Sequence, residues 1–443
     1  MKRILLTFVA LAASTTSSAQ QLPPIRPLGA TVAVANDSLG TLVYARHLPG
    51  GVLVNDPQTR RVLMYDSTLA HATVIADSTS ATANAYSGRM GGLIAYRGDS
   101  SLFVDPQSMS MLVIDPAGKV QRVMSVPRSQ DAMSLGNNAI GTPALDGSGR
   151  LVYRGFPRPN FRAGGPGGGG PGSAGFTPPE IPDSTPVMRV DLTTRQTDTV
   201  GFVKVPKIKF DVQRDDNGRV NITSQANPLP TVDDFAVLAD GSIAMVRGRD
   251  YHVDFVRPDG TRESAPKIPF EWRRLSDEDK VAFLDSVKAA RQRMAANAPV
   301  PLVENRATTR DGGQRGGDGG GPGGPPGEVR VMIGGPGGGV GGPPGMGGLN
   351  FVPASELPDY QPAFFAGAAR GDADGNLWVR TIATKNLGGG PVYDVINTKG
   401  LLIDRVQVPK DRIIIGFGQG GVVYLLARDG NGATGKLERA RIR

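Results

Sequence analysis

The chain has 443 residues and a formal net charge of +8, with 61 glycines, 36 prolines and no cysteine. The lack of cysteine excludes disulfide scaffolds, thiolate metal sites and cysteine nucleophiles. A chain of this length suggests about three domains of average size, although repetitive all-β folds often form one unit this large. The basic residues form no long run and no cluster with aromatic residues, so nucleic-acid binding is not expected.

Residues 1–19 have the three-part organisation of a secretory signal peptide. Lys2 and Arg3 precede an apolar run from Ile4 to Ala13, and small residues end at Ala19. The apolar run of about ten residues is shorter than the roughly 20 that span a bilayer. We therefore expect cleavage after Ala19 and a periplasmic or secreted mature protein without a membrane span.

Between residues 30 and 443 a pattern of short apolar strands and turns rich in Gly and Asp recurs six times. The first copy joins residues 50–54 to 62–66, and the second joins 100–104 to 111–115. Turns near positions 51, 100 and 149 are spaced by 49 residues. This spacing is typical of a four-stranded propeller blade of about 40 to 50 residues. The pattern predicts an all-β fold, a six-bladed β-propeller over residues 30–443.

Two insertions interrupt the period of this repeat. Residues 163–175 are mostly glycine and proline, and residues 311–348 contain 20 glycines. Such a composition buries too little apolar surface to offset the entropy of ordering, so both are predicted to be disordered loops. Neither contains the Lys followed by Ser or Thr that a phosphate-binding P-loop requires.

A helical insertion is predicted at residues 271–310. Ser276 and three acidic residues after it form an N-terminal cap, and the helix is expected from about Asp277 to Asn297. An apolar stripe should face the rest of the protein; its members are Phe283, Val287, Ala290 and Met294. The helix either packs on the outside of the ring or forms a lid over the central channel.

Closing a propeller usually requires a strand from one terminus to complete the last blade. Ala30–Val34 is an alternating β-branched segment in the right place for this role. We predict that it pairs with the last blade.

Few residues suggest catalysis. The three histidines, His47, His71 and His252, are far apart and lack metal-ligand spacing. The run from Asp372 to Asn376 resembles the start of a calcium loop but lacks the Glu at the twelfth position, so we interpret it as a hairpin turn. No Gly-x-Ser-x-Gly nucleophile motif occurs. No catalytic residue is assigned.

Arginine ends the second strand of several copies. Arg154, Arg247, Arg380 and Arg428 occupy this position, with Arg97 as a looser member. Equivalent positions in successive blades surround the axis, so these guanidinium groups could converge and bind a carboxylate or phosphate by bidentate hydrogen bonds. The alternative is that each arginine pairs with a carboxylate in its own or a neighbouring blade.

Residues 237–256 and 358–380 resemble the six-bladed β-propeller proteins exported by environmental bacteria, which are related to NHL and TolB-like propellers. The resemblance implies an exported six-bladed ring and no residue roles. Gluconolactonase-like propellers hold a divalent cation in the channel with Glu, Asn and Asp side chains. The acidic candidates here, Asp233, Asp234 and Asp372, lack clear Glu and Asn partners, so no residue is transferred.

We therefore expect a monomeric module that binds a small anionic ligand or an envelope protein or polymer, and that needs no cofactor. The alternative is a metal-dependent hydrolase similar to lactonases, with a divalent cation in the central channel. A third reading is an envelope scaffold whose basic surface holds an anionic polymer in a salt-sensitive way.

Overall fold

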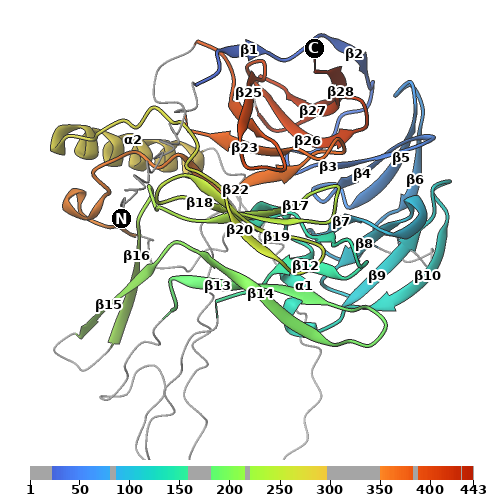
Figure 1. The fold of residues 1–443 in the computed structure, drawn as a ribbon, viewed down its shortest axis with the longest axis horizontal. Helices are drawn as coiled ribbons and strands as arrows, with labels where there is room; N and C mark the ends of the chain where they lie inside the picture. The colour runs from blue at the N-terminus through green and yellow to red at the C-terminus, as the bar shows by residue number, and fades with distance from the viewer. Residues whose placement is uncertain are drawn as a thin grey trace, which may run out of the picture.

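The protein is an all-β chain whose sheets are arranged around an axis as a β-propeller (Figure 1). The computed structural model describes residues 22–79, 86–157, 181–214, 220–296, 350–382, 388–430 and 432–442. The predicted signal peptide and both predicted Gly/Pro-rich loops lie outside these residues. None of the helices in the described ranges is long and apolar enough to cross a membrane.

Among the described residues, six sheets share one design, with four strands side by side. Sheet 1 consists of β3 (Tyr44–Leu48), β4 (Gly51–Asp56), β5 (Arg61–Asp66) and β6 (Ala72–Ala76). Sheet 2 consists of β7 (Gly92–Ala95), β8 (Ser101–Asp105), β9 (Ser110–Ile114) and β10 (Val120–Ser125). Sheet 3 consists of β11 (Ala144–Leu145), β12 (Leu151–Arg154), β13 (Ser184–Val190) and β14 (Thr197–Lys204).

The other three sheets continue the same order along the chain. Sheet 4 consists of β17 (Asp234–Val237), β18 (Ile243–Arg247), β19 (His252–Val256) and β20 (Arg262–Ser264). Sheet 5 consists of β22 (Phe364–Gly371), β23 (Leu377–Thr381), β24 (Val392–Ile396) and β25 (Leu402–Gln407). Sheet 6 consists of β26 (Arg412–Gly418), β27 (Val422–Arg428), β28 (Gly435–Arg441) and β2 (Thr31–Val34).

The first strands of these sheets line the centre of the ring. β3 lies against β7, β7 against β11, β11 against β17, and β17 against β22. The ring continues from sheet 5 to sheet 6 where Arg370 donates a 2.8 Å hydrogen bond to the carbonyl of Ile414. It closes where β26 lies against β3. The predicted β-propeller is confirmed. The six sheets described here correspond to the six predicted blades, and the blade number stays a prediction.

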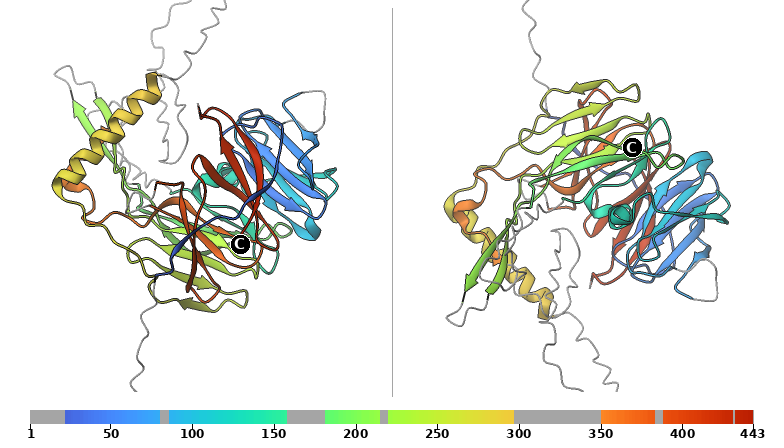
Figure 2. Two further views of the ribbon diagram at one scale, coloured as in Figure 1. Left: turned by 90° about the horizontal axis from the view of Figure 1, so that it is seen from above. Right: turned by 90° about the horizontal axis from the view of Figure 1, so that it is seen from below.

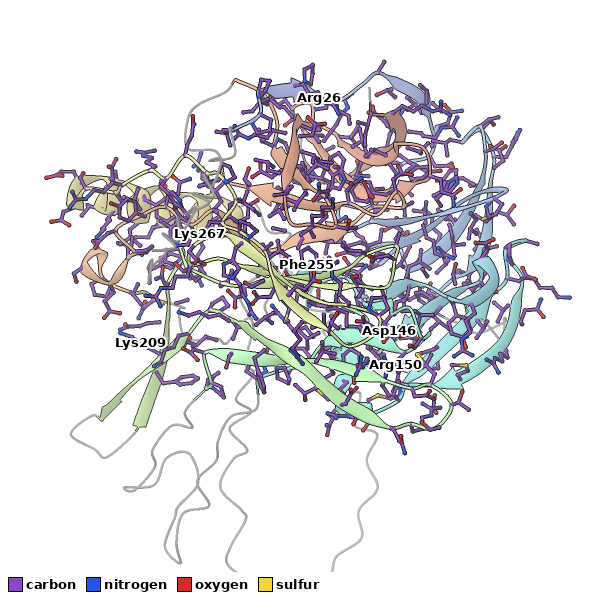
Figure 3. All side chains as sticks on the ribbon, in the orientation of Figure 1. Arg26, Asp146, Arg150, Lys209, Phe255 and Lys267 are labelled. Carbon is purple, nitrogen blue, oxygen red and sulfur yellow. The ribbon has the colours of Figure 1, made fainter. Side chains whose placement is uncertain are left out.

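Two strands from the N-terminal part of the chain pair with the outer strands of sheets 5 and 6. β2 pairs antiparallel with β28, as predicted for Ala30–Val34. β1 (Ile25–Pro27) pairs parallel with β25 and adds a fifth strand to sheet 5, which was not predicted. Arg26 of β1 forms an ion pair with Asp404 of β25 at this edge (Figure 3). Cleavage after Ala19 would leave both strands intact.

The ring has two different faces. On one face, short turns join first to second and third to fourth strands; we call it the turn face. On the other, the connections join second to third strands and each sheet to the next; we call it the insertion face. The long connections, 154–184, 204–234 and 264–364, all belong to the insertion face. The longest connections therefore begin and end on one side of the ring, and binding residues are often carried by such connections.

Aspartates shape the turn face. The carboxylate of Asp146 accepts backbone hydrogen bonds from Ser148 and Arg150, and Asp372 accepts them from Asp374 and Asn376. These bonds are Asx turns, in which a glycine takes the positive φ that the hairpin needs. Gly375 has φ +92°. The turn interpretation of Asp372 to Asn376 is confirmed.

Additional elements lie on the insertion face. A hairpin of β15 (Ile208–Arg214) and β16 (Val220–Ala226) pairs with β21 (Asn350–Phe351) to form a three-stranded sheet that was not predicted. The predicted helix is confirmed as α2 (Asp277–Ala296). Figure 2 shows α2 and the hairpin projecting together to one side of the ring. Four short helical turns also lie in connections of this face; they are η2 (Ser129–Asp131), α1 (Ala132–Leu135), η3 (Asn138–Ile140) and η4 (Ala354–Glu356), whereas η1 (Arg97–Asp99) lies on the turn face.

Helix α2 packs outside the ring and does not cover the channel (Figure 2). Its buried apolar residue among those described is Leu284, which belongs with Val352 and Leu357 to a small cluster separate from the ring. The predicted stripe faces the same way, since Phe283, Val287 and Ala290 are half-buried. The side chain of Met294 lies outside the described part. Of the two predicted positions, the outer one is confirmed.

Candidate functional site

The four arginines chosen from the sequence all lie at the insertion-face end of a second strand. Arg154, Arg247 and Arg428 are the last residues of β12, β18 and β27, and Arg380 is the penultimate residue of β23. Arg97 differs, because it follows the first strand of sheet 2 and lies in the turn β7 to β8 on the opposite face. Its inclusion in the set was wrong: the tyrosine–arginine pair resembled a second-strand end although the strand before it is a first strand.

Strand parity decides which space each arginine enters, because alternate residues of a strand share a face. Val152, two residues before Arg154, packs with Phe235 and Met245 of sheet 4. Met245, two residues before Arg247, packs in the same cluster against sheet 3. Arg154 and Arg247 therefore both enter the space between sheets 3 and 4.

The other two arginines enter other spaces. Trp378, two residues before Arg380, packs with sheet 6, and Leu426, two residues before Arg428, packs with sheet 1. Both Arg380 and Arg428 are exposed. The structure thus brings two of the four candidates together.

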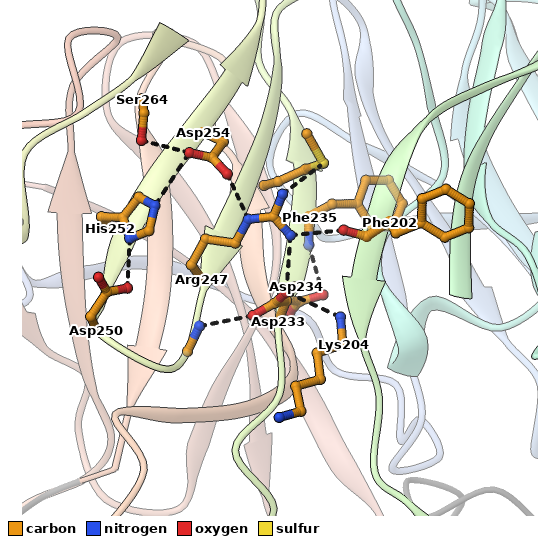
Figure 4. Close-up of polar contacts among 12 residues, drawn as sticks. Phe202, Lys204, Asp233, Asp234, Phe235, Arg247, Asp250, His252, Asp254 and Ser264 are labelled. Atoms are coloured by element: carbon orange, nitrogen blue, oxygen red, sulfur yellow. Dashed lines mark hydrogen bonds and ion pairs between the residues drawn. The ribbon is translucent and has the colours of Figure 1, made fainter. Parts of the chain in front are cut away.

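Arg247 is held by carboxylates on both sides (Figure 4). Its Nε donates to Asp254 at 2.7 Å and its Nη1 donates to Asp233 at 2.9 Å and to the carbonyl of Phe202 at 2.7 Å. His252 lies between Asp250 and Asp254, with ring nitrogens 2.7 Å and 3.2 Å from their oxygens. Arg247 is therefore fully engaged by the protein, which matches the ion-pair alternative considered for it.

Arg154 has the opposite character. Only 9% of the residue is exposed, and its Nε and Nη1 atoms are buried without a hydrogen-bond partner in the part of the chain that the structure describes. Burial lowers the pKa of Arg154, and the charge of Asp234 partly offsets this effect. A guanidinium carries five donors in a fixed fork, and leaving buried donors unpaired is costly. The guanidinium of Arg154, which we call the fork, is therefore a buried cation below the insertion face, and two of its nitrogens lack acceptors among the described residues.

The acidic group whose charge acts on Arg154 is the fully buried Asp234, at the start of the first strand of sheet 4. Its carboxylate accepts a 2.9 Å hydrogen bond from the backbone N–H of Ala369 in sheet 5 and one from its neighbour Phe235. Burial raises the pKa of Asp234, while the hydrogen bond from Ala369 and the charge of Arg154 lower it. No ion pair joins Asp234 to Arg154 within 4 Å among the described contacts, so Asp234 does not occupy the fork.

The connection from sheet 2 to sheet 3 crosses the mouth of the ring; we call residues 129–141 the bridging segment. Its helix α1 lies against β12, and η3 lies against β22 on the other side of the ring. A Cβ added at Gly141 would come within 2.4 Å of the ring of Phe235, so the segment also packs closely on sheet 4. The bridging segment therefore covers the channel opening beside β12, the strand that ends in Arg154.

Two polar side chains of the bridging segment are also buried without a partner for one atom, Ser134 at Oγ and Asn138 at Oδ1. Asp131, in contrast, accepts a 2.6 Å hydrogen bond from the hydroxyl of Tyr153 and pairs with Arg128. The sequence analysis missed Ser134 and Asn138. No signal in the sequence marks them, because a serine and an asparagine in an irregular connection are ordinary surface residues.

The three acidic candidates considered for a channel metal centre, and not assigned to it, all have protein partners. Asp233 binds Arg247, Asp234 accepts backbone N–H groups, and Asp372 accepts from Trp378 Nε1 as well as its own turn. No group of three or more His, Asp or Glu side chains in the described ranges could hold a metal ion. The three histidines are in sheet 1, in the turn between β5 and β6, and in sheet 4. In the described part of the chain, the three carboxylates are therefore engaged by protein donors and do not form a cation site.

A pocket of about 330 Å³ lies between sheets 5 and 6 on the turn face. It contains three carboxylates that already have partners. Asp372 and Asp374 accept hydrogen bonds from turn N–H groups, and Asp404 pairs with Arg26. The pocket therefore offers no free charged group to a ligand, unlike the fork of Arg154.

No family model and no curated protein matches the chain. Solved structures that resemble it include a member of the DUF4221 family from Bacteroides vulgatus, with 9% identity, coverage of 96% of this chain and 98% of the other, and a TM-score of 0.40. A putative gluconolactonase has 12% identity, coverage of 94% and 91%, and a TM-score of 0.34. TolB from Acinetobacter baumannii has 8% identity, coverage of 90% and 63%, and a TM-score of 0.32. Likenesses this distant carry no argument about function, so the function has to be argued from the site.

Proposed function

We propose that the protein is an exported six-bladed β-propeller that binds a small anion, a carboxylate or a phosphate, on its insertion face. The observation that carries the proposal is the buried Arg154, whose Nε and Nη1 atoms have no hydrogen-bond partner among the described residues. A planar guanidinium binds the paired oxygens of a carboxylate or phosphate in a bidentate manner. An anion of this kind supplies the acceptors that the described residues do not supply.

The location of the fork supports this reading. It lies between sheets 3 and 4, beside the bridging segment that covers the channel. Ligand sites are usually concave, largely apolar and equipped with a few polar groups that fix orientation. The clustering of insertions on the same face is consistent with a binding surface. Periplasmic or secreted localisation rests on the signal-like residues 1–19 and belongs to the proposal.

We expect sulfate and acetate to raise the melting temperature of the wild-type protein relative to chloride at equal ionic strength. An anion at a hundredfold its dissociation constant adds about 2.7 kcal/mol to the free energy of unfolding. In Arg154→Met the acetate effect should disappear, and the sulfate effect should fall to the general stabilisation that sulfate gives to folded proteins. Arg380→Met is the matched control, since Arg380 is exposed near the end of β23 and should leave the anion effect unchanged.

Stability without added anion separates a ligand site from a structural arginine. Replacing an unpaired buried charge by an apolar side chain of similar volume is neutral or stabilising. Arg154→Met should therefore unfold at the same urea concentration as wild type, or at a higher one, in anion-poor buffer. A loss of stability there, together with an unchanged anion effect, would contradict the proposal.

A second prediction concerns the buried carboxylate of Asp234. Its folded-state pKa is raised, so it takes up a proton at a higher pH in the folded protein than in the unfolded chain. As the pH falls through this raised pKa, the negative charge that opposes an anion disappears, and sulfate should bind more tightly. Sulfate itself does not titrate in this range. The affinity is measured by isothermal titration calorimetry as a function of pH.

Asp234→Asn is the variant that isolates this group, because the amide oxygen can still accept from the N–H of Ala369. We expect severalfold tighter sulfate binding at neutral pH, the size of one charge interaction of about 1 kcal/mol, and a weaker pH dependence. Equal affinities of wild type and Asp234→Asn across the pH range would show that Asp234 does not face the anion.

The hydrolase alternative predicts a stoichiometric divalent cation in the purified protein and a lower melting temperature after chelation. No observation in the described residues favours it over the anion site, because the channel carboxylates are occupied by protein donors.

A further inference from the structure

The hairpin on the insertion face leaves one long strand edge without a partner. β15 pairs with β16 over seven residues, from Ile208 to Arg214, in an uninterrupted register. No other strand in the described ranges pairs with the outer edge of β15. Figures 1 and 2 show the hairpin projecting away from the ring. Alternate N–H and C=O groups of such an edge are free to bond another strand.

The outer edges of the ring sheets are protected by the devices that natural proteins use against edge pairing. The pairings of β6, β10, β14 and β2 with their neighbours contain irregular registers. β20 has only three residues, and β25 is covered by β1. β15 has seven residues, a regular register and no proline. A long and regular edge, in a protein whose ring sheets have short, irregular or covered edges, favours an edge in use.

The start of this edge is basic. Lys204, Lys207 and Lys209 fall within six residues, and all three are exposed. Figure 3 shows Lys209 on the projecting hairpin, where it pairs with Glu356. Lys204 and Lys207 form no ion pair among the contacts of the described residues. Near the start of β15, two lysines without ion-pair partners among the described residues favour an acidic segment as the strand that binds this edge. A second copy of the chain is disfavoured because it would bring the same lysines together.

We propose that the free edge of β15 binds an extended acidic segment of a partner protein by β-strand addition. Main-chain hydrogen bonds along the edge supply affinity that does not depend on sequence, and the lysines select acidic side chains. The proposal is independent of the anion site, since β15 and Arg154 belong to different sheets.

The charge part is tested with two labelled peptides, one of alternating glutamate and threonine and one of alternating lysine and threonine. Fluorescence anisotropy with the full chain should show binding of the glutamate peptide only, weakening as salt is added. The double variant Lys204→Glu with Lys207→Glu should weaken that binding by roughly fivefold to tenfold. Lys119→Glu with Lys399→Glu, two exposed turn lysines in sheets 2 and 5, is the matched control and should leave it unchanged.

The backbone part is tested with the same glutamate peptide methylated at alternate amide nitrogens. Methylation removes the donors that a strand addition requires, so binding should be lost even though the charge is unchanged. Lys209→Pro and Phe210→Pro remove neighbouring N–H groups that point to opposite edges of β15. We expect one of the two to keep the melting temperature of wild type while losing the peptide.

Three results would overturn the proposal. Equal binding of the methylated peptide would show that the contact is only electrostatic. Equal binding of the lysine peptide would remove the charge selection. A concentration-dependent dimer in sedimentation equilibrium, abolished by the proline variant that keeps the fold, would show that a second copy occupies the edge.

Discussion

Deletion of residues 22–34 is expected to destabilise the protein by about 5 kcal/mol or more, because it opens the ring at the last sheet. The deletion removes β1 and β2, the buried Leu28, and the backbone hydrogen bond that Leu28 donates to Gln407. It also leaves β28 as an exposed edge, which promotes association. Urea unfolding and size-exclusion chromatography measure the two effects.

Deletion of residues 22–27 is the matched control. It removes only β1, which adds a fifth strand to a sheet that already has four. Its cost should be much smaller, since β2 and Leu28 remain. A peptide of residues 28–39 added to the longer deletion should restore part of the lost stability. Equal stability of both deletions would mean that β2 does not close the ring.

Trp378→Ala is expected to cost about 3 to 5 kcal/mol, the usual cost of removing a fully buried large aromatic side chain. Trp378 is 1% exposed and lies between sheets 5 and 6, with ring centroids 6.0 Å from Tyr393 and 5.2 Å from Phe417. Its Nε1 donates a 2.8 Å hydrogen bond to the turn carboxylate of Asp372. The substitution therefore leaves a cavity between two sheets and removes a donor from the turn.

Trp272 is the other tryptophan of the chain and provides the control. It is 40% exposed and contacts Phe270, so Trp272→Ala should cost no more than about 1 kcal/mol. Trp378→Phe keeps most of the ring volume but loses the N–H, and should fall between the two. Similar midpoints of urea unfolding for both alanine variants would contradict the packing described between sheets 5 and 6.

The strands of the ring were predictable because each follows a local rule. Alternating β-branched residues bounded by Gly and Asp indicate a strand between hairpin turns, and the predicted segment 62–66 lies within β5. The β15–β16 hairpin was missed because it lies between two copies of the repeat and has no equivalent in the others. β21 could not be predicted at all, since two residues carry no period and their partner strand is far away in the chain.

The candidate site was predictable in part. The sequence places the arginines at the ends of second strands, and the structure confirms this for Arg154, Arg247, Arg380 and Arg428. The sequence does not reveal between which two sheets each arginine side chain lies, because a shift of one residue in the strand moves a side chain to the opposite face. Nor does it distinguish the buried, unpartnered Arg154 from the ion-paired Arg247, since that difference depends on contacts between separate sheets.

The most direct test of the account is a crystal structure of the protein grown with selenate, whose anomalous signal locates the anion. The account predicts an anomalous selenium peak beside the guanidinium of Arg154, with selenate oxygens about 2.8 Å from two adjacent guanidinium nitrogens, and no such peak in Arg154→Met crystals. An Arg154 guanidinium bonded to Asp234 or to a protein carbonyl, with no selenate beside it, would contradict the anion site.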